Sequence, residues 1–191
     1  MTGRQKTMTY SISAVLIVIT ALVIILNYKR MKQSIKGAIG KSFFSIRELC
    51  ASDTARRYNI DNTPTPEVTT RLQALIDNVL DPARKEYGSY IYVNSGYRSP
   101  RLNAAVGGAT HSQHLKGEAA DITTKSAEKD KQLFAIIVRQ NNFDQLIWEK
   151  PKNSRWIHVS YKANGGNRHQ ILAYNGSSYT NITNNWQTYT T

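Results

Sequence analysis

The chain has 191 residues, of which 40% are hydrophobic and 20% charged, which fits one globular domain of ordinary size plus an appendage. Its net charge of +12 indicates an anionic partner such as nucleic acid, lipid headgroups or an acidic wall polymer. The basic residues form no stripe interleaved with aromatic residues, so nucleic-acid binding is not expected. Cys50 is the single cysteine, which excludes an intrachain disulfide and indicates a small buried apolar residue.

The first predicted element is an uncharged apolar segment, "SISAVLIVITALVIILNY", at residues 11–28. Its length is close to the roughly 18–20 residues that a helix needs to cross a bilayer. The segment ends in "ILNYKRMK" rather than in small residues, so an uncleaved anchor is favoured over a cleaved signal peptide. We therefore expect an N-terminal segment, 1–28, that contains a transmembrane helix, followed by a basic linker at 29–41.

A globular domain is expected at residues 42–174. Thr65 as N-cap and Pro66 at the first helical position begin a predicted helix, which Pro82 should kink or end. Further helices are predicted at 99–108 and 126–141, and strands at 90–94, 118–123, 144–149, 156–161 and 169–174.

The helices come mostly before and between strands that follow each other closely. This order favours an α+β fold with a small antiparallel sheet flanked by helices. Residues 175–191 are rich in Asn, Thr and Ser and are expected to form a loose polar tail.

The possible metal ligands come from separate segments, because the helical H-E-x-x-H signature is absent. His114 and Asp121 are seven residues apart, and Gly117 between them permits a sharp turn. His158 lies on a strand whose other face is apolar, and it is the expected third ligand. His111 and His169 are expected at the surface.

A carboxylate is expected next to this cluster. If the strands at 144–149 and 156–161 form a hairpin with a symmetric register, residue 149 pairs with 156 and residue 147 with 158. Glu149 then lies diagonally from His158 on the same face, about 7–8 Å away between backbones. That position suits a base that holds a water, whereas a one-residue slip would turn Glu149 to the other face.

Arg98 follows a strand, in a loop that contains Gly96 and Pro100. It is either solvated or, beside a metal, placed to bind a substrate carboxylate or an oxyanion. From the residues alone, a metal site and a set of unrelated structural side chains both stay open, although an unpaired Asp121 in an apolar strand would be costly.

The stretch "SQHLKGEAAD", residues 112–121, resembles the S-x-H-x-x-G-x-A-x-D motif of the zinc D-Ala-D-Ala carboxypeptidases and their relatives, the M15 peptidases. The similarity extends over about 42–174 and is closest to a small branch common in bacterial and phage genomes. It implies a fold shared with the Hedgehog signalling domain, and a zinc ion held by His114, Asp121 and His158. It also implies Glu149 as the base, with Arg98 and Ser112 contacting substrate; Trp156, on the face of His158, is expected to join them.

The resemblance implies hydrolysis of a peptide bond in peptidoglycan stem peptides near a D-amino acid, by a carboxypeptidase or an endopeptidase. A non-catalytic, zinc-stabilised binding module of the Hedgehog-like fold is the alternative, and a wall-penetrating virion protein is a third hypothesis. Glu149 favours the enzyme, because a binding module needs no base.

Two features disagree about the side of the membrane on which the domain lies. Lys and Arg are more numerous after residues 11–28 than before them, which favours a cytoplasmic domain. Peptidoglycan lies outside the cytoplasmic membrane, and we give this more weight, so a membrane-anchored protein with an extracytoplasmic domain is expected. The sequence predicts no oligomeric state.

Overall fold

The computed structural model describes residues 17, 20, 22–26 and 42–190. The chain forms two compact units, residues 1–41 and 42–191, each described by itself. In the first unit residues 22–26 are helical. Among the described residues, no helix is both long and apolar enough to cross a membrane. Most of the predicted anchor at 11–28 and all of the predicted linker at 29–41 lie outside the described residues.

The second unit is built on a six-stranded sheet with the order β1-β2-β4-β3-β5-β6. All five predicted strands are present, and a sixth follows them. The bounds are β1 Tyr92–Ser95, β2 Ala119–Thr123, β3 Gln145–Glu149, β4 Trp156–Ser160, β5 Gln170–Tyr174 and β6 Tyr179–Asn181. The prediction of a mixed α+β domain with a sheet flanked by helices is confirmed.

The expected antiparallel sheet is present except at one pairing, because β3 and β5 run parallel while the other neighbouring strands are antiparallel. The loop between β4 and β5 stays at the end of the sheet where β3 begins. Asp144, just before β3, accepts hydrogen bonds from Arg168, just before β5. Both strands therefore start side by side, with Gln145 opposite Gln170.

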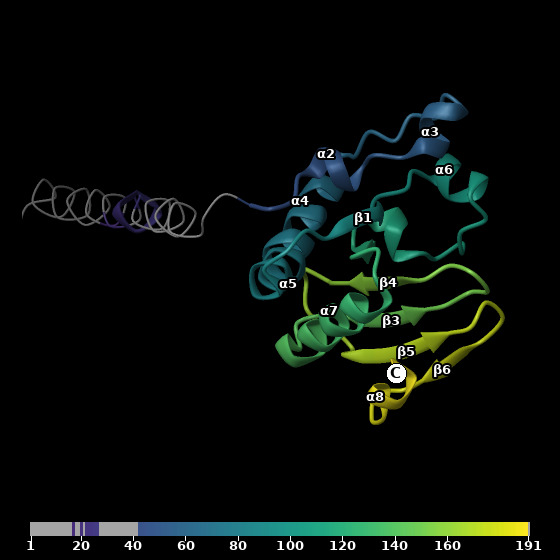
Figure 1. The fold of residues 1–191 in the computed structure, drawn as a ribbon. Coiled ribbons are helices and arrows are strands. Elements are labelled where there is room, and N and C mark those ends of the chain that lie inside the picture. The colour runs from purple at the N-terminus through teal and green to yellow at the C-terminus, as the bar shows by residue number, and fades with distance from the viewer. Residues whose placement is uncertain (1–16, 18–19, 21, 27–41, 191) are drawn as a thin grey trace, which may run out of the picture. The chain divides into compact units, whose positions relative to one another are not determined.

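Several helices pack against one face of the sheet, and the other face carries the site (Figure 1). The helical elements are α2 Ile46–Leu49, α3 Asp53–Arg57, α4 Pro66–Leu75, η1 Ile76–Leu80, α5 Asp81–Tyr87, α6 Pro100–Ala105, η2 Gln113–Lys116, α7 Ala127–Gln140 and α8 Trp186–Tyr189. Apolar side chains of α4, η1, α5 and α7 pack against alternate strand residues, such as Ile122, Trp148 and Ile157. The remaining strand residues, Asp121, Glu149 and His158 among them, point to the opposite face.

Pro82 does not end the helix, and the irregularity at this point is a π-helical turn before the proline rather than a simple kink. The chain stays helical from α4 through α5, with a π-helical turn at η1 directly before the proline. Pro82 has no N–H for the carbonyl of Asn78. That carbonyl instead accepts a hydrogen bond of 2.9 Å from Nδ2 of Asn142, which satisfies the group that the proline leaves open.

Residues 175–190 differ from the expected loose tail. They form β6 and α8, and β6 pairs with β5 at the edge of the sheet. Ile182 is fully buried, and the ring of Trp186 lies 6.0 Å from that of Phe134 in the core. Two apolar side chains in a polar segment thus attach it to the core.

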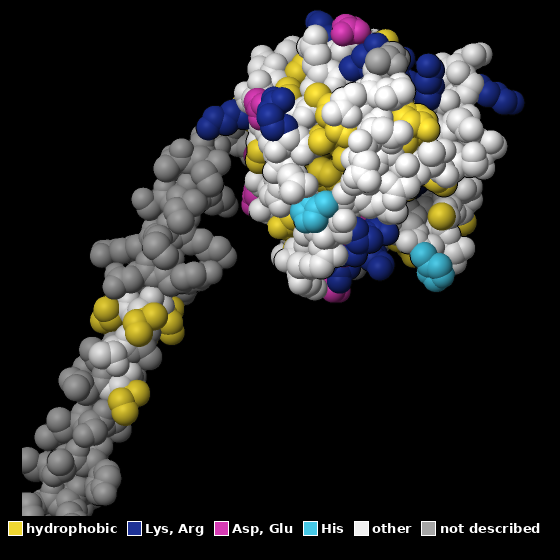
Figure 2. All heavy atoms as spheres, turned by 90° about the horizontal axis from the view of Figure 1, so that it is seen from below, with side chains coloured by type: hydrophobic (Ala, Val, Ile, Leu, Met, Phe, Trp, Pro, Cys, Tyr) yellow, Lys and Arg dark blue, Asp and Glu magenta, His cyan; other side chains and the backbone are white. Residues whose placement is uncertain are grey.

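Lys and Arg side chains gather in several groups on the face shown in Figure 2, where Asp and Glu are few. His111 and His169 are exposed, as expected. Cys50 is half-buried rather than buried, and burial raises the pKa of its thiol to about 11. The thiol is therefore protonated near neutral pH and is no strong nucleophile or ligand.

Candidate active site

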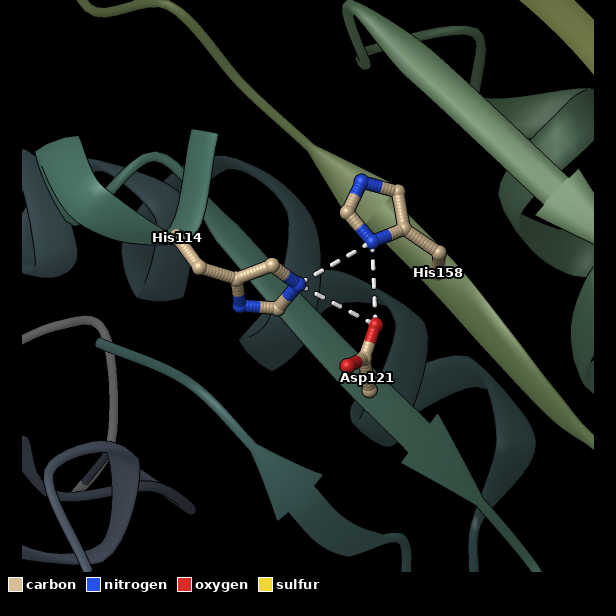
Figure 3. Close-up of side chains that lie close together, drawn as sticks. All are labelled: His114, Asp121 and His158. Atoms are coloured by element: carbon tan, nitrogen blue, oxygen red, sulfur yellow. Dashed lines mark hydrogen bonds and ion pairs between the residues drawn. The ribbon is translucent and has the colours of Figure 1, made fainter. Parts of the chain in front are cut away.

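His114, Asp121 and His158 point toward one another from η2, β2 and β4 (Figure 3). Oδ1 of Asp121 lies 2.9 Å from Nδ1 of His158 and 3.2 Å from Nε2 of His114, and the two ring nitrogens are 3.2 Å apart. All three residues are buried. The structure thus brings together the three predicted ligands from segments up to 44 residues apart.

The motif around His114 is shaped by local hydrogen bonds and one glycine. Ser112 is the N-cap of η2, and its Oγ accepts a hydrogen bond from the N–H of His114. Gly117 ends η2 with φ +71°, and a side chain there would collide with Val68. The expected sharp turn at Gly117 is present and leads directly into β2, which carries Asp121.

The backbone of Gly96 orients the ring of His114. A carbonyl only accepts, so Nδ1 of His114 donates its hydrogen to the carbonyl of Gly96, at 2.6 Å, and the lone pair of Nε2 faces Asp121. A Cβ at Gly96 would lie 2.2 Å from the carbonyl oxygen of Leu49. Only glycine fits this close approach of two backbones. No pattern in the sequence predicts this role of Gly96.

Arg98 contacts Asp121, one of the three predicted metal ligands, directly. Its Nη2 donates to Oδ2 of Asp121 at 2.7 Å, and its Nε donates to Oγ of Ser95 at 2.9 Å. Burial raises the pKa of Asp121, but while His114 and His158 are protonated their charges and hydrogen bonds outweigh it and hold that pKa well below its usual range. When the histidines lose their protons to bind a metal, the guanidinium of Arg98 still pairs with the carboxylate.

The donor set fits a divalent cation. Two ligands about 2.0–2.1 Å from a tetrahedral zinc ion are about 3.3–3.4 Å apart, close to the 2.9–3.2 Å separations measured. The second nitrogen of His114 and the second oxygen of Asp121 are each held by an outer partner, as is typical of metal sites. Three protein ligands leave one position of a tetrahedral site open, which is the catalytic rather than the structural pattern.

Glu149 lies beside this cluster, in the register expected from the sequence. In the β3–β4 hairpin Ile147 pairs with His158 and Glu149 pairs with Trp156, so Glu149 and His158 are diagonal neighbours on one face. Burial, and next the negative charge of Asp121, raise the pKa of Glu149 to about 7, against the opposing charges of His158 and Arg98. A carboxyl group with this pKa can both accept and release a proton near neutral pH.

The triad and Glu149 line a cleft of about 1110 Å³. The other predicted site residues, Arg98, Ser112 and Trp156, also line it. Nε1 of Trp156 is buried and has no hydrogen-bond partner among the described residues. Arg155, three residues before His158, pairs with the buried carboxylate of Asp130.

Tyr179 of β6 also lines the cleft, although it was not among the site residues predicted from the sequence. Its ring stacks on that of Tyr174, with centroids 4.4 Å apart, and Tyr174 is the register neighbour of Glu149. Trp156, Glu149, Tyr174 and Tyr179 therefore form one row across four strands. Only the pairing of β5 with β3 and β6 brings Tyr179 here, and no sequence pattern signals that pairing.

A protein-family model described as Peptidase M15 matches residues 42–160. The match covers His114, Asp121 and His158 as well as Arg98 and Glu149, and it ends at the last residue of β4. A search of curated proteins found no match. The family model matches more than half of the chain, and the matched region contains a buried His-Asp-His group that could hold a metal ion. The chain therefore belongs to the M15 peptidase family.

Proposed function

We propose that the chain is a zinc-dependent peptidase that hydrolyses peptidoglycan stem peptides near D-amino acids, as a D-Ala-D-Ala carboxypeptidase or an endopeptidase. The observation that supports it is the convergence of His114, Asp121 and His158 in a cleft, with Glu149 on the neighbouring strand of the same face. The family supplies the class of reaction, and the motif "SQHLKGEAAD" supplies the substrate class.

The roles of the side chains follow from their positions. A zinc ion held by the three ligands would lower the pKa of water toward 7 and polarise the scissile carbonyl. Glu149 accepts a proton from the attacking water and delivers it to the nitrogen of the leaving amine as the C–N bond breaks. Arg98 fixes Asp121 and presents its guanidinium edge to the cleft, where it binds a substrate carboxylate or the developing oxyanion.

A non-catalytic, zinc-stabilised binding module is the second candidate function, and Glu149 separates the two. A structural metal site needs no carboxylate with a pKa near 7 beside its ligands, and burying one there lowers stability. The position of Glu149 in the cleft therefore favours the enzyme.

The test uses the full chain loaded with zinc, purified peptidoglycan and mass spectrometry of the released muropeptides. The wild-type protein should cleave the stem peptides, and the masses identify the bond. Glu149→Gln should bind one zinc per chain yet cleave at least about 100-fold more slowly. Cleavage by Glu149→Gln at the wild-type rate would remove Glu149 as base, and zinc binding with no cleavage by the wild-type protein would favour the binding module.

We also propose that residues 11–28 anchor the protein in the cytoplasmic membrane, with the catalytic unit outside the cytoplasm. Leu22, Val23, Ile24, Ile25 and Leu26 are exposed apolar side chains in helical conformation, which supports an apolar surrounding for them. Added protease should digest the catalytic unit on intact spheroplasts. Full protection of that unit would show that it lies inside.

A further inference from the structure

We propose that the cleft contains a cationic subsite, formed by Lys162 and Arg168, that binds a carboxylate of the substrate two to four residues from the bond that is cut. The inference rests on the proposed function, because it assigns an anionic peptide to the same cleft. Both residues lie in the loop between β4 and β5, outside the region that the family model matches.

A fully buried carboxylate holds the two basic side chains in place. Asp144 accepts hydrogen bonds from Nε and Nη2 of Arg168, at 3.0 and 2.5 Å, and lies 3.0 Å from Nζ of Lys162. It also accepts from Nε2 of Gln113, at 3.1 Å, and from the backbone N–H of Arg168. Both oxygens of Asp144 are thus fully engaged, and the loop is fixed to the start of β3.

The charges in this cluster do not cancel. One carboxylate faces two cations, so the group carries a net positive charge of one. Asp144 is fully buried, whereas the side chains of Lys162 and Arg168 are 34% and 47% exposed. Lys162, Arg168 and Gln113 all line the cleft. The surplus positive charge therefore faces the space that a substrate fills, where a carboxylate would complete the pairing.

The position relative to the metal ligands sets the distance along the substrate. Gln113 directly precedes His114, and Lys162 follows His158 by four residues. Four residues of extended chain span about 13 Å, and a bound extended peptide advances by the same 3.3 Å or so per residue. Because the lysine and arginine side chains are long, the carboxylate they meet belongs to a residue two to four positions from the scissile bond.

The two ends of β3 give the cleft an electrostatic direction. Asp144, with its two cations, directly precedes β3, and Glu149 ends it, about 17 Å away along an extended strand. A peptide carboxylate is repelled by an ionised Glu149 and attracted by Lys162 and Arg168. The cluster therefore favours peptides that carry a carboxylate at the end of the cleft where β3 begins.

The test varies the charge of the protein and of the substrate together. Two synthetic stem peptides are compared, identical except that the carboxyl groups distant from the scissile bond are free in one and amidated in the other. Lys162→Gln should lower kcat/KM for the free-acid peptide about five- to tenfold and change the amidated peptide less than twofold. Lys162→Arg, which keeps the charge, should restore the preference for the acid.

Lys150→Gln is the matched control. Lys150 is an exposed lysine that follows β3 and lines a separate pocket, so its loss changes the net charge equally without touching the subsite. Thermal melts of all variants verify the fold. Equal losses with both peptides, or the same loss in Lys150→Gln, would overturn the subsite.

Binding of the same two peptides, measured by titration calorimetry, separates the subsite from the enzyme. If the wild-type protein cleaves neither peptide but binds the free acid more tightly, and Lys162→Gln abolishes that difference, the proposed function fails and the subsite stands. If neither peptide binds, or both bind equally, the subsite is wrong.

Discussion

Nη2 of Arg98 donates to Oδ2 of Asp121 at 2.7 Å, so that Oδ1 is the oxygen that faces His114 and His158. The guanidinium is itself held by Ser95 and is 17% exposed. Besides any contact with substrate, Arg98 therefore determines which carboxylate oxygen of Asp121 faces the predicted metal position.

Arg98→Gln should weaken zinc binding by about 10- to 100-fold, the usual effect of removing an outer partner of a metal ligand. Competition with a chromogenic chelator measures the affinity. Arg101→Gln removes an exposed arginine of α6 and should leave it unchanged. An affinity of Arg98→Gln within twofold of the wild type would mean that Arg98 does not orient Asp121.

Gly96→Ala should cost at least about 2 kcal/mol of unfolding free energy and weaken zinc binding, because the new methyl group would displace the backbone that holds His114. Gly165→Ala is the control: nothing lies within 4 Å of a Cβ there, and its φ of +82° costs only about 1 kcal/mol. Urea titration gives both free energies. A Gly96→Ala protein with normal zinc affinity would contradict the role of the Gly96 carbonyl.

The rate of peptide cleavage should depend on pH through Glu149. The base must be ionised, so kcat/KM should fall about tenfold per pH unit on the acid side of its pKa. The pKa of Glu149 is about 7 without a metal, and the positive charge of a bound ion would lower it from that value. The rate should therefore begin to decrease with falling pH at about pH 7 or at a lower pH. A pH–rate profile measures this. If the rate already decreases well above pH 7 as the pH is lowered, another group is the base.

Glu149 should also make the metal-free protein less stable at high pH. Its folded-state pKa of about 7 lies above its usual 4.5, so it costs nothing below pH 4.5, and its cost grows as the pH rises toward 7. The shift corresponds to at most about 3 kcal/mol, which partial solvent access reduces to about 1–2 kcal/mol. Urea titrations in EDTA should show Glu149→Gln more stable than the wild type at pH 8 and equal to it at pH 4. Equal stability at both pH values would show that the carboxylate is well solvated.

Ile182→Ala should cost about 2–5 kcal/mol, because the side chain is fully buried although its segment is polar. Asn184→Ala, at a nearby exposed position, should change stability by less than about 0.5 kcal/mol. Thermal or urea melts distinguish the two. If Ile182→Ala is as stable as the wild type, the C-terminal segment contributes nothing to the stability of the folded unit.

The site residues were predictable where the chemistry is local. Glu149 and His158 belong to one hairpin, and alternation along two strands determines that both point to one face. The turn at Gly117 similarly links His114 to Asp121 over a short stretch. These relationships depend on strand periodicity and turn geometry, and both can be recognised in short stretches of consecutive residues.

The unpredicted features depend on contacts between distant residues. The parallel pairing of β5 rests on Asp144 and Arg168, and the order of the C-terminal segment rests on Ile182 and Trp186 in the core. The Gly96 carbonyl is a backbone group, which no residue type identifies. A single sequence carries no signal for such contacts, whose energy appears only when the chain is folded.

Asp121 and His158 are direct register partners on β2 and β4, in the interior of the sheet. An ion held by both joins two strands that must separate when the sheet opens. Zinc should therefore slow amide hydrogen exchange in β2 and β4, and at zinc concentrations above the dissociation constant for zinc the slowing should grow in proportion to the zinc concentration. The exchange rate of β6, at the edge of the sheet, should not change with zinc.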